Sequence, residues 1–285
     1  MQPTAHQEPV VRQHTEGPVL IYAGATVVPP EGIRELVRLP KILKTLSGST
    51  SRQTGRETLW RWDPPWLQDR RLVVRQSAHG GLLGRLWGAL FLSPRPMLRE
   101  LEIALHAYRS AVPTCRPVAL RLERVWGLFW RAHHLSEEVS GAQNLLELCQ
   151  STGPKTPYPP EARRDLAQAI AQTISAMHEA GIRHGDLNLK NLLVAERQGR
   201  VEAYVIDFKK ACLQNHVSVQ ARLRNLIRLD RSVMKWPAAR RAITVSDRLR
   251  TLRAYLALQP QQKENWKAIA HRIRTRHSAH APSRK

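Results

Sequence analysis

Cysteine and long apolar runs are both scarce in this chain of 285 residues. The three cysteines (Cys115, Cys149 and Cys212) lie far apart and form no Cys-x-x-Cys pair, which argues against a disulfide framework or a zinc site and fits a reducing cytosolic compartment. The longest apolar stretch, Leu86–Leu92, is far shorter than the about 20 residues that cross a bilayer. The first residues also lack the basic start and apolar core of a signal peptide. Any membrane contact is therefore expected to be peripheral.

Acidic residues are few as well, with 23 Asp and Glu against 45 Lys and Arg and a net charge of +22. The excess is uneven, because residues 213–285 hold 17 basic and three acidic residues, whereas residues 151–212 are nearly balanced. Such a balance predicts an anionic partner, which is a nucleic acid, an acidic lipid surface or a phosphorylated substrate. Because 42% of the residues are hydrophobic, a folded core is expected rather than disorder.

The order of the expected elements predicts an α+β fold with a small strand-rich N-lobe and a helical C-lobe. We expect four segments: a poorly defined extension at 1–40, the N-lobe at 41–139, the C-lobe at 140–275 and a basic tail at 276–285. Helices are expected at 96–110 and 161–179, where apolar residues recur every three or four positions. Strands are expected at Glu57–Trp62, Arg70–Gln76, Val201–Phe208 and twice within 117–139, with a split near Glu123 and Arg124, and several basic helices across 216–275.

Two stretches carry the chemistry, His184-Gly185-Asp186-Leu187-Asn188-Leu189-Lys190-Asn191 and Val205-Ile206-Asp207-Phe208. Phosphoryl transfer needs positioned phosphates, a metal that neutralises charge, and a group that orients the attacking hydroxyl. Asp186 follows a long helix in a loop that can present its carboxylate to an alcohol, so it is the candidate catalytic base. Asn191 precedes one apolar stretch and Asp207 ends another, and their oxygens are the ligands that Mg²⁺ prefers. The two stretches resemble the kinase signature H-x-D-x-x-x-x-N followed by D-F-G, with Lys209 in place of the glycine.

The upstream half should then supply the ATP-binding groups. Gly48 and Gly55 bracket a turn at the place of a glycine-rich phosphate loop, although the spacing is not G-x-G-x-x-G and a plain hairpin turn fits equally well. Arg75 stands where such kinases carry a lysine, and Glu100 is positioned on the following helix to pair with it. Glu138 and Val139 would contact adenine through their backbone groups, and Lys190 completes the predicted ATP-binding set.

Further motifs make the chain similar to the lipopolysaccharide kinase family, which includes 3-deoxy-D-manno-octulosonic acid (Kdo) kinases and heptose kinases. The similarity covers about residues 45–235 and lies in the catalytic loop, in Val205–Phe208, and in Val73-Val74-Arg75, His79-Gly80-Gly81-Leu82-Leu83-Gly84-Arg85, Arg99-Glu100-Leu101, Glu138-Val139-Ser140-Gly141-Ala142 and Asn225-Leu226-Ile227-Arg228-Leu229-Asp230-Arg231-Ser232. Lys209 and Lys210 depart from the pattern, because the family often has an acid after the aromatic residue.

The resemblance implies a protein-kinase-like fold and an enzyme that uses ATP and Mg²⁺ at the cytoplasmic face of the bacterial inner membrane. It implies phosphorylation of a sugar hydroxyl, the 4-hydroxyl for a Kdo kinase, on a lipid A-bearing glycolipid acceptor. The basic C-terminal helices would then bind the anionic inner-membrane surface, with Trp236 and Trp266 at the interface.

Four other functions stay open at this point. A core heptose kinase shares the same catalytic residues. A small-molecule phosphotransferase of the aminoglycoside or choline kinase type fits less well, because only three acids follow residue 212. A pseudokinase scaffold is suggested by Arg75 and Lys209, but the presence of Asp186, Asn191 and Asp207 argues against it. A basic nucleic-acid-binding protein fits the charge, yet the aromatic residues form no stacking pattern, so no specific nucleic acid is expected.

Overall fold

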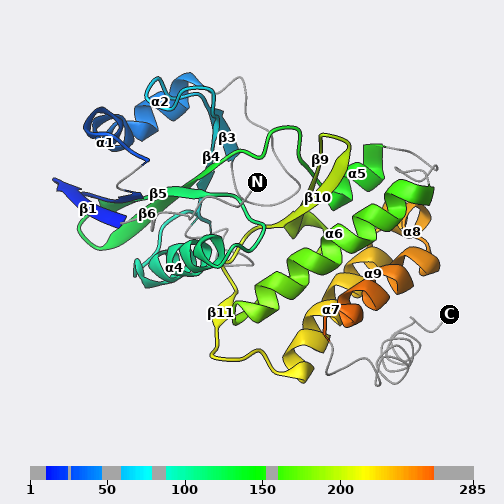
Figure 1. Cartoon of the computed structure of the whole chain (residues 1–285). Helices are drawn as coiled ribbons and strands as arrows, with labels where there is room; N and C mark the ends of the chain where they lie inside the picture. Colours follow the sequence, from blue (N-terminus) through cyan, green and yellow to red (C-terminus); the bar gives the residue numbers. More distant parts are fainter. Residues whose placement is uncertain (1–10, 25–26, 47–58, 79–87, 152–159, 260–285) are drawn as a thin grey trace, which may run out of the picture. The chain divides into compact units, whose positions relative to one another are not determined.

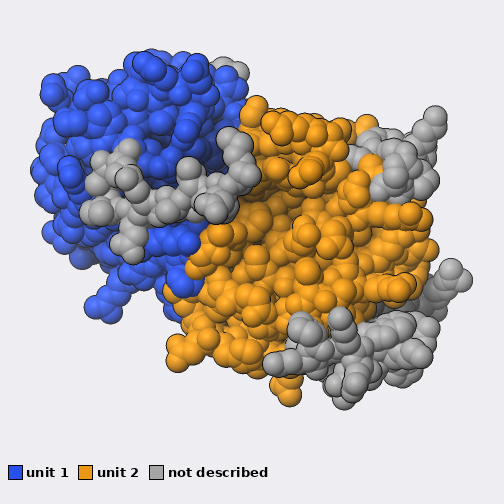
Figure 2. All heavy atoms as spheres, in the orientation of Figure 1, with its two compact units in different colours: residues 1–109, 115–138 blue, residues 110–114, 139–285 orange. Residues whose placement is uncertain are grey.

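The computed structural model describes residues 11–24, 27–46, 59–78, 88–151 and 160–259. The chain divides into two compact units, the first formed by Met1–Arg109 and Cys115–Glu138 and the second by Ser110–Thr114 and Val139–Lys285 (Figure 2). The first unit carries the large sheet, and the second carries most of the helices (Figure 1). The short segment Ser110–Thr114 belongs to the second unit because Thr114 Oγ1 donates a 2.7 Å hydrogen bond to Val205 O.

The sheet of the first unit has six strands in the order β1-β2-β5-β6-β4-β3, and every neighbouring pair is antiparallel. The strands are β1 (Val11–Glu16), β2 (Val19–Gly24), β3 (Leu59–Trp62), β4 (Leu72–Gln76), β5 (Pro117–Val125) and β6 (Phe129–Glu137). The expected strands at Glu57–Trp62 and Arg70–Gln76 correspond to β3 and β4. Arg75 thus lies near the end of an inner strand, opposite His134 of β6.

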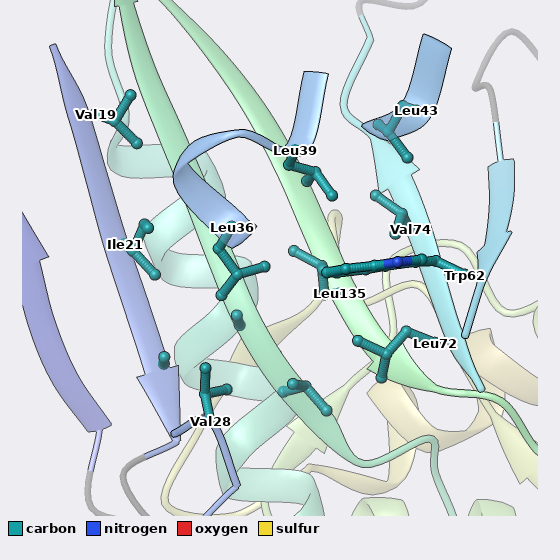
Figure 3. Close-up of a cluster of buried hydrophobic side chains, with 13 residues drawn as sticks. Val19, Ile21, Val28, Leu36, Leu39, Leu43, Trp62, Leu72, Val74 and Leu135 are labelled. Carbon is teal, nitrogen blue, oxygen red and sulfur yellow. The ribbon is translucent and has the colours of Figure 1, made fainter. Parts of the chain in front are cut away.

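The segment 11–46 differs from the poorly defined extension expected at 1–40. Its strands β1 and β2 join the sheet, and its helices α1 (Pro30–Val37) and α2 (Leu39–Thr45) cover one sheet face. Figure 3 shows Leu36 and Leu39 directed at Ile21 and Leu135 of the sheet, within one cluster of buried side chains. Strand β2 is apolar throughout. Val19, Ile21 and Ala23 are buried in this cluster, whereas Leu20 and Tyr22 pack against a second cluster, which explains why the segment folds with the sheet.

Helix α4 (Arg95–Arg109) covers a second apolar cluster, which also contains Leu120, Leu122 and Ala132 of strands β5 and β6. This helix confirms the one expected at 96–110. Its buried residues include Glu100, whose carboxylate is therefore largely shielded from water. Each Å² of apolar surface buried in such a contact stabilises the fold by about 25 cal/mol, and this holds the helix on the strands.

The expected break between the two strands of 117–139 was misplaced. Strand β5 continues through Glu123 and Arg124, and the chain turns at Trp126 and Gly127, which both have positive φ (50° and 70°). A tight antiparallel turn favours such values because they match the twist of the strands. The sequence signal was masked because tryptophan is an unusual residue at this turn position.

The second unit is built around helix α6 (Pro160–Glu179), which confirms the helix expected at 161–179. Its Ala171, Ile174 and Met177 are fully buried, and the helix packs against α9 (Val245–Ala257) and strand β10 (Arg200–Val205). The other elements are β7 (Gln143–Asn144), α5 (Leu145–Ser151), β8 (Ile182–Arg183), the short 3-10 helix η2 (Leu189–Asn191), β9 (Leu192–Arg197), β11 (Cys212–Leu213), α7 (Val219–Lys235) and α8 (Pro237–Ala242).

Helices α7, α8 and α9 confirm the basic helices expected after residue 216, as far as Gln259; residues 260–275 lie outside the described part of the chain. Among the described residues, no helix is long and apolar enough to cross a membrane.

Candidate active site

The candidate base Asp186 lies in the loop between β8 and η2, and this loop is organised around the buried ring of His184. The Nδ1 atom of His184 accepts a 3.1 Å hydrogen bond from the backbone N–H of Asp186. Its Nε2 lies 3.1 Å from the carbonyl oxygen of Ile206 and therefore carries the proton. Burial lowers the pKa of His184, which keeps the ring neutral and preserves this pair of bonds. His184 thus ties the loop of Asp186 to the segment that carries Asp207.

A second layer of polar side chains holds the backbone of His184. Asn225 of α7 donates from Nδ2 to the carbonyl oxygen of His184 and accepts its N–H at Oδ1, at 3.2 Å. The same Oδ1 lies 3.0 Å from Nε2 of His178, whose Nδ1 lies 2.8 Å from the Tyr255 hydroxyl. Burial lowers the pKa of His178 to about 4, so a neutral ring donates to Asn225 and accepts from Tyr255. Three helices, α6, α7 and α9, therefore fix the loop.

Asn191 is positioned by its own amide nitrogen. Its Nδ2 donates a 2.9 Å hydrogen bond to the carbonyl oxygen of Asp186, five residues earlier. Asn188 donates to the same oxygen at 2.8 Å and accepts the N–H of Lys190 at 2.9 Å, which begins η2. Because the Asn191 nitrogen is used within the loop, its Oδ1 is the atom that can bind a cation.

The sequence predicted that Asp207 ends a strand, and this prediction is wrong. Strand β10 ends at Val205, and Asp207 lies two residues later with φ at +65°, a value that non-glycine residues seldom adopt. The N–H of Ile206 donates a 3.0 Å hydrogen bond to the carbonyl oxygen of Asn191. This bond joins the Asp207 segment to the end of the catalytic loop, so Asn191 and Asp207 belong to neighbouring, linked segments of one unit.

The carboxylate of Asp186 is itself paired with two cations. Nζ of Lys210 lies 2.8 Å from Oδ2, and Nη1 of Arg228 lies 3.4 Å from Oδ1. Burial alone would raise the pKa of Asp186, but the hydrogen bond and charge of Lys210, together with the charge of Arg228, outweigh burial and lower it. Asp186 is therefore ionised at neutral pH, the form that a base requires.

A divalent cation fits the residues present. Asp207 offers a carboxylate and Asn191 an amide oxygen, and Mg²⁺ in nucleotide sites is commonly bound by one or two such groups together with phosphate oxygens and water. The described residues contain no group of three or more His, Cys, Asp and Glu that could form a complete metal cage. The two oxygen donors of Asn191 and Asp207 suit a metal that arrives with the nucleotide phosphates.

In the first unit, the predicted pair between Arg75 and Glu100 is confirmed. Nη2 of Arg75 donates to Oε1 of Glu100, and the other carboxylate oxygen lies 3.5 Å from Nε2 of His134. The side chains of Arg75 and Glu100 are only 17% and 6% exposed. Screening by water is weak there, so removal of one partner would leave a costly buried charge.

The remaining predicted ATP-binding residues have other contacts or lie outside the described range. The Glu138 carboxylate pairs with Arg61 at 2.6 Å, and its N–H donates to Arg71 O at 2.8 Å. The Val139 carbonyl accepts from Ala142 at 3.0 Å. Of these two residues, the N–H of Val139 and the remaining lone pairs of the backbone carbonyl oxygens are therefore the groups that could hydrogen-bond to adenine.

Nζ of Lys190 lies 5.1 Å from the ring centre of Trp236, which is a cation–π contact. Gly48 and Gly55 lie outside the described residues.

Sequence reasoning missed four participants: Lys210, Arg228, His178 and Tyr255. Arg228 and its neighbour Asn225 stood within the family-like stretch, and Lys210 was noted only as a departure. The useful signal was the spacing of Asn225, Arg228 and Ser232, which places three side chains on one face of a helix. His178 and Tyr255 gave no signal, because a buried polar contact between two distant helices cannot be read from either helix alone.

Comparison with known proteins agrees with this geometry. The model of the "Lipopolysaccharide kinase (Kdo/WaaP) family" matches residues 55–255, which is more than half of the chain. Two similar curated proteins are the 3-deoxy-D-manno-octulosonic acid kinases of Vibrio parahaemolyticus, 30% identical over 65% of this chain and 73% of that protein, and of Vibrio cholerae, 31% identical over 64% and 72%.

A solved structure described as "WaaP in complex with acyl carrier protein" matches with a TM-score of 0.58 and 19% identity, over 89% of this chain and 98% of that one. This likeness confirms the expected α+β, protein-kinase-like fold. The family match also confirms that the protein is a kinase that phosphorylates an acceptor, as the sequence predicted. On these grounds the chain belongs to the lipopolysaccharide kinase (Kdo/WaaP) family.

Proposed function

We propose that this kinase transfers the γ-phosphate of ATP, with Mg²⁺, to the 4-hydroxyl of Kdo on Kdo-lipid A. The observation that carries the proposal is the ionised Asp186 carboxylate, held in a loop that His184 and Asn225 fix from the buried side. The names of the similar Vibrio kinases support the acceptor class.

Asp186 acts as the base in this mechanism. Its carboxylate accepts a hydrogen bond from the acceptor hydroxyl and takes its proton as the oxygen attacks the γ-phosphorus. A new O–P bond forms, the bond from the γ-phosphorus to the bridging oxygen breaks, and ADP leaves with that oxygen. A base of this kind contributes roughly 10²- to 10⁴-fold to the rate. The loop supplies orientation, because a displacement of the base by about 1 Å can cost 10²-fold.

Asn191 and Asp207 would hold the Mg²⁺, which supplies charge neutralisation on the phosphates when it is bound. Arg75, fixed by Glu100, would contact the phosphates in place of the usual lysine. Arginine keeps the charge but presents a planar fork of donors. Backbone groups of Glu138 and Val139 would contact the adenine. The predicted roles of Gly48, Gly55 and Lys190 in ATP binding stay predictions, and the contact of Lys190 with Trp236 gives its ammonium another partner.

We place the enzyme at the cytoplasmic face of the inner membrane as a peripheral protein. Support comes from the charge of helices α7, α8 and α9, which are rich in Lys and Arg and contain only two acidic residues, Asp230 and Asp247. Each Lys or Arg near an anionic leaflet contributes about 1 kcal/mol. Flotation with phosphatidylglycerol vesicles, but not with phosphatidylcholine vesicles, is the expected result.

The acceptor is tested by incubating the purified protein with ATP, Mg²⁺ and either Kdo-lipid A or a heptose-terminated core acceptor. We expect phosphate on Kdo-lipid A alone, at a position that ³¹P–¹H correlation assigns to the 4-hydroxyl. Transfer only to the heptose acceptor would overturn the proposed acceptor but not the kinase chemistry. Unchanged transfer in excess EDTA would overturn the role of Mg²⁺.

A further inference from the structure

Two cations share the carboxylate of Asp186, and each comes from a different element. Lys210 belongs to the segment between β10 and β11, and Arg228 belongs to α7. Their charged groups contact different oxygens of Asp186, at 2.8 Å and 3.4 Å. Both side chains are more than half exposed, at 64% and 53%, whereas that of Asp186 is 33% exposed. The group therefore carries one net positive charge at a place that a ligand can reach.

The backbones under both cations are fixed, although the side chains are exposed. On α7, Asn225 binds the backbone of His184, and Ser232 Oγ accepts the N–H of Leu189 at 3.1 Å. Arg228 lies between these two anchors. Helix α7 is therefore bound to the catalytic loop on both sides of Arg228, which places the guanidinium beside Asp186.

Lys210 is held by close backbone packing. A Cβ atom at Gly185 would lie 2.0 Å from the carbonyl oxygen of Lys210, so only glycine permits this approach. The loop residue before Asp186 thus packs directly on the backbone of Lys210. The two cations belong to a preformed arrangement and not to a chance encounter of surface side chains.

If Asp186 acts as the base, the two cations that pair with it need another anionic partner. A base must accept a hydrogen bond from the acceptor hydroxyl, yet both of its oxygens already face a cation. When the hydroxyl takes one oxygen of Asp186, the cation at that oxygen loses its partner. Exposed ion pairs are worth only about 0–1 kcal/mol, so the exchange is easy if the acceptor brings its own negative group.

We propose that Lys210 and Arg228 bind the carboxylate of the sugar acid acceptor, and that this contact selects an acidic sugar over a neutral one. The inference rests on the proposed function, because it takes Kdo as the acceptor. Arginine presents a fork of donors that matches a carboxylate, and lysine adds a point charge beside it. The carboxylate of the acceptor replaces that of Asp186 as the partner of the cations. Asp186 then turns one oxygen to the hydroxyl on the same sugar ring.

A neutral heptose cannot make this exchange. Its hydroxyl would displace a cation from Asp186 and offer no charge in return, so a neutral sugar gains no charge-assisted contact with Lys210 or Arg228. The same two residues therefore account for a choice between acceptors that the catalytic loop cannot make by itself, because Asp186, Asn191 and Asp207 serve either sugar.

The test compares Kdo-lipid A with the same glycolipid after reduction of its Kdo carboxyl to an alcohol. Five proteins are assayed: the wild type, the double variant Lys210→Ala with Arg228→Ala, each of the two single variants, and Arg200→Ala as a control. Arg200 is an exposed arginine of β10, outside the proposed site and outside the basic helices. Loss of a charge-assisted contact changes kcat/KM by roughly 10- to 100-fold. We expect the wild type and the control to prefer the acid by that factor, and the double variant to discriminate by no more than about twofold.

Two kinetic constants, the KM for ATP and the KM for the acceptor, show whether Lys210 and Arg228 bind the nucleotide phosphates or the acceptor carboxylate. The KM for ATP is expected to stay within about twofold of the wild type in all variants, while the KM for the acid acceptor rises. A rise in the KM for ATP with an unchanged acceptor KM would overturn the inference and assign the cations to the nucleotide phosphates. Full retention of the acid preference in the double variant would also overturn it. Melting temperatures close to that of the wild type show that the variants fold.

Acceptor binding without ATP keeps this inference apart from the proposed function. Tighter binding of the acid glycolipid than of the reduced one, lost in the double variant, supports the carboxylate site whether or not phosphate is transferred. Equal affinities of the wild type for both glycolipids overturn the site. Absence of transfer to Kdo-lipid A by a wild type that binds it would overturn only the proposed function.

Discussion

Asn225→Ala is the substitution that tests most sharply how the catalytic loop is held. The side chain is buried and makes three contacts: it donates to the carbonyl oxygen of His184, accepts from the N–H of His184, and contacts Nε2 of His178. Alanine leaves two buried backbone groups and one imidazole nitrogen without these partners. Each such group costs about 1–3 kcal/mol, and because partial relaxation makes the costs less than additive, we expect a loss of about 3–5 kcal/mol.

The rate should fall with the stability. A loosened loop misplaces Asp186, and a displacement of about 1 Å lowers phosphate transfer by roughly 100-fold. Urea denaturation followed by circular dichroism measures the stability, and hydrogen exchange of residues 182–191 measures the local opening of the loop. The matched control is Arg224→Ala, the exposed neighbour on α7, which should change the free energy of unfolding by less than about 0.5 kcal/mol.

The result that would refute this reasoning is equally specific. If Asn225→Ala unfolds within about 0.5 kcal/mol of the wild type and the loop exchanges at the same rate, then the three hydrogen bonds do not hold the loop. The account of a loop fixed by α6, α7 and α9 would have to be abandoned.

Three further perturbations test other contacts. Burial lowers the pKa of His178 to about 4 from its unfolded value near 6.5, so the unfolded chain binds the proton more readily. The stability that His178 contributes is therefore complete above about pH 6.5, and the free energy of unfolding decreases by about 3 kcal/mol as the pH falls to 4. His178→Gln should flatten this slope in urea titrations at different pH values. Gly185→Ala should lower the free energy of unfolding by about 2 kcal/mol or more and remove most of the activity, because the new Cβ would overlap the carbonyl oxygen of Lys210. In the control Gly199→Ala the new Cβ meets no atom within 4 Å, so only about 1 kcal/mol of backbone strain is expected. Equal melting temperatures of the two variants would contradict this. Glu100→Gln should destabilise the first unit by about 3 kcal/mol and raise the KM for ATP, because its arginine partner stays charged and mostly buried; an unchanged melting curve and KM would show that the pair has no role.

Local features of the fold were readable from the sequence. The apolar spacing of 161–179 predicted helix α6, because a helical period is set within one short segment. The pairing of Arg75 with Glu100, which are 25 residues apart, was predicted instead from the resemblance to the kinase motif. The loop from His184 to Asn191 is likewise local, and its side chains return hydrogen bonds to their own backbone.

The predictions that failed depended on contacts between distant segments. Residues 1–40 were expected to form a poorly defined extension, but β2 within them pairs with β5, which lies about a hundred residues later in the chain, and β1 pairs with β2. Asp207 was expected to end a strand, but β10 ends at Val205, Ile206 donates to Asn191 of the catalytic loop, and Asp207 has a positive φ. The partners of Asp186 come from two separate elements, and no periodicity in one segment reveals such a meeting.

The measurement that tests the central claim most directly is the transfer of labelled γ-phosphate from ATP to Kdo-lipid A by the wild type and by Asp186→Asn, at equal protein concentration with Mg²⁺. Asparagine keeps the size of the side chain but cannot take the proton. The account predicts label on the glycolipid with the wild type and a rate lower by roughly 10²- to 10⁴-fold with the variant, at an unchanged affinity for ATP. Equal rates for the two proteins would contradict the assignment of Asp186 as the base.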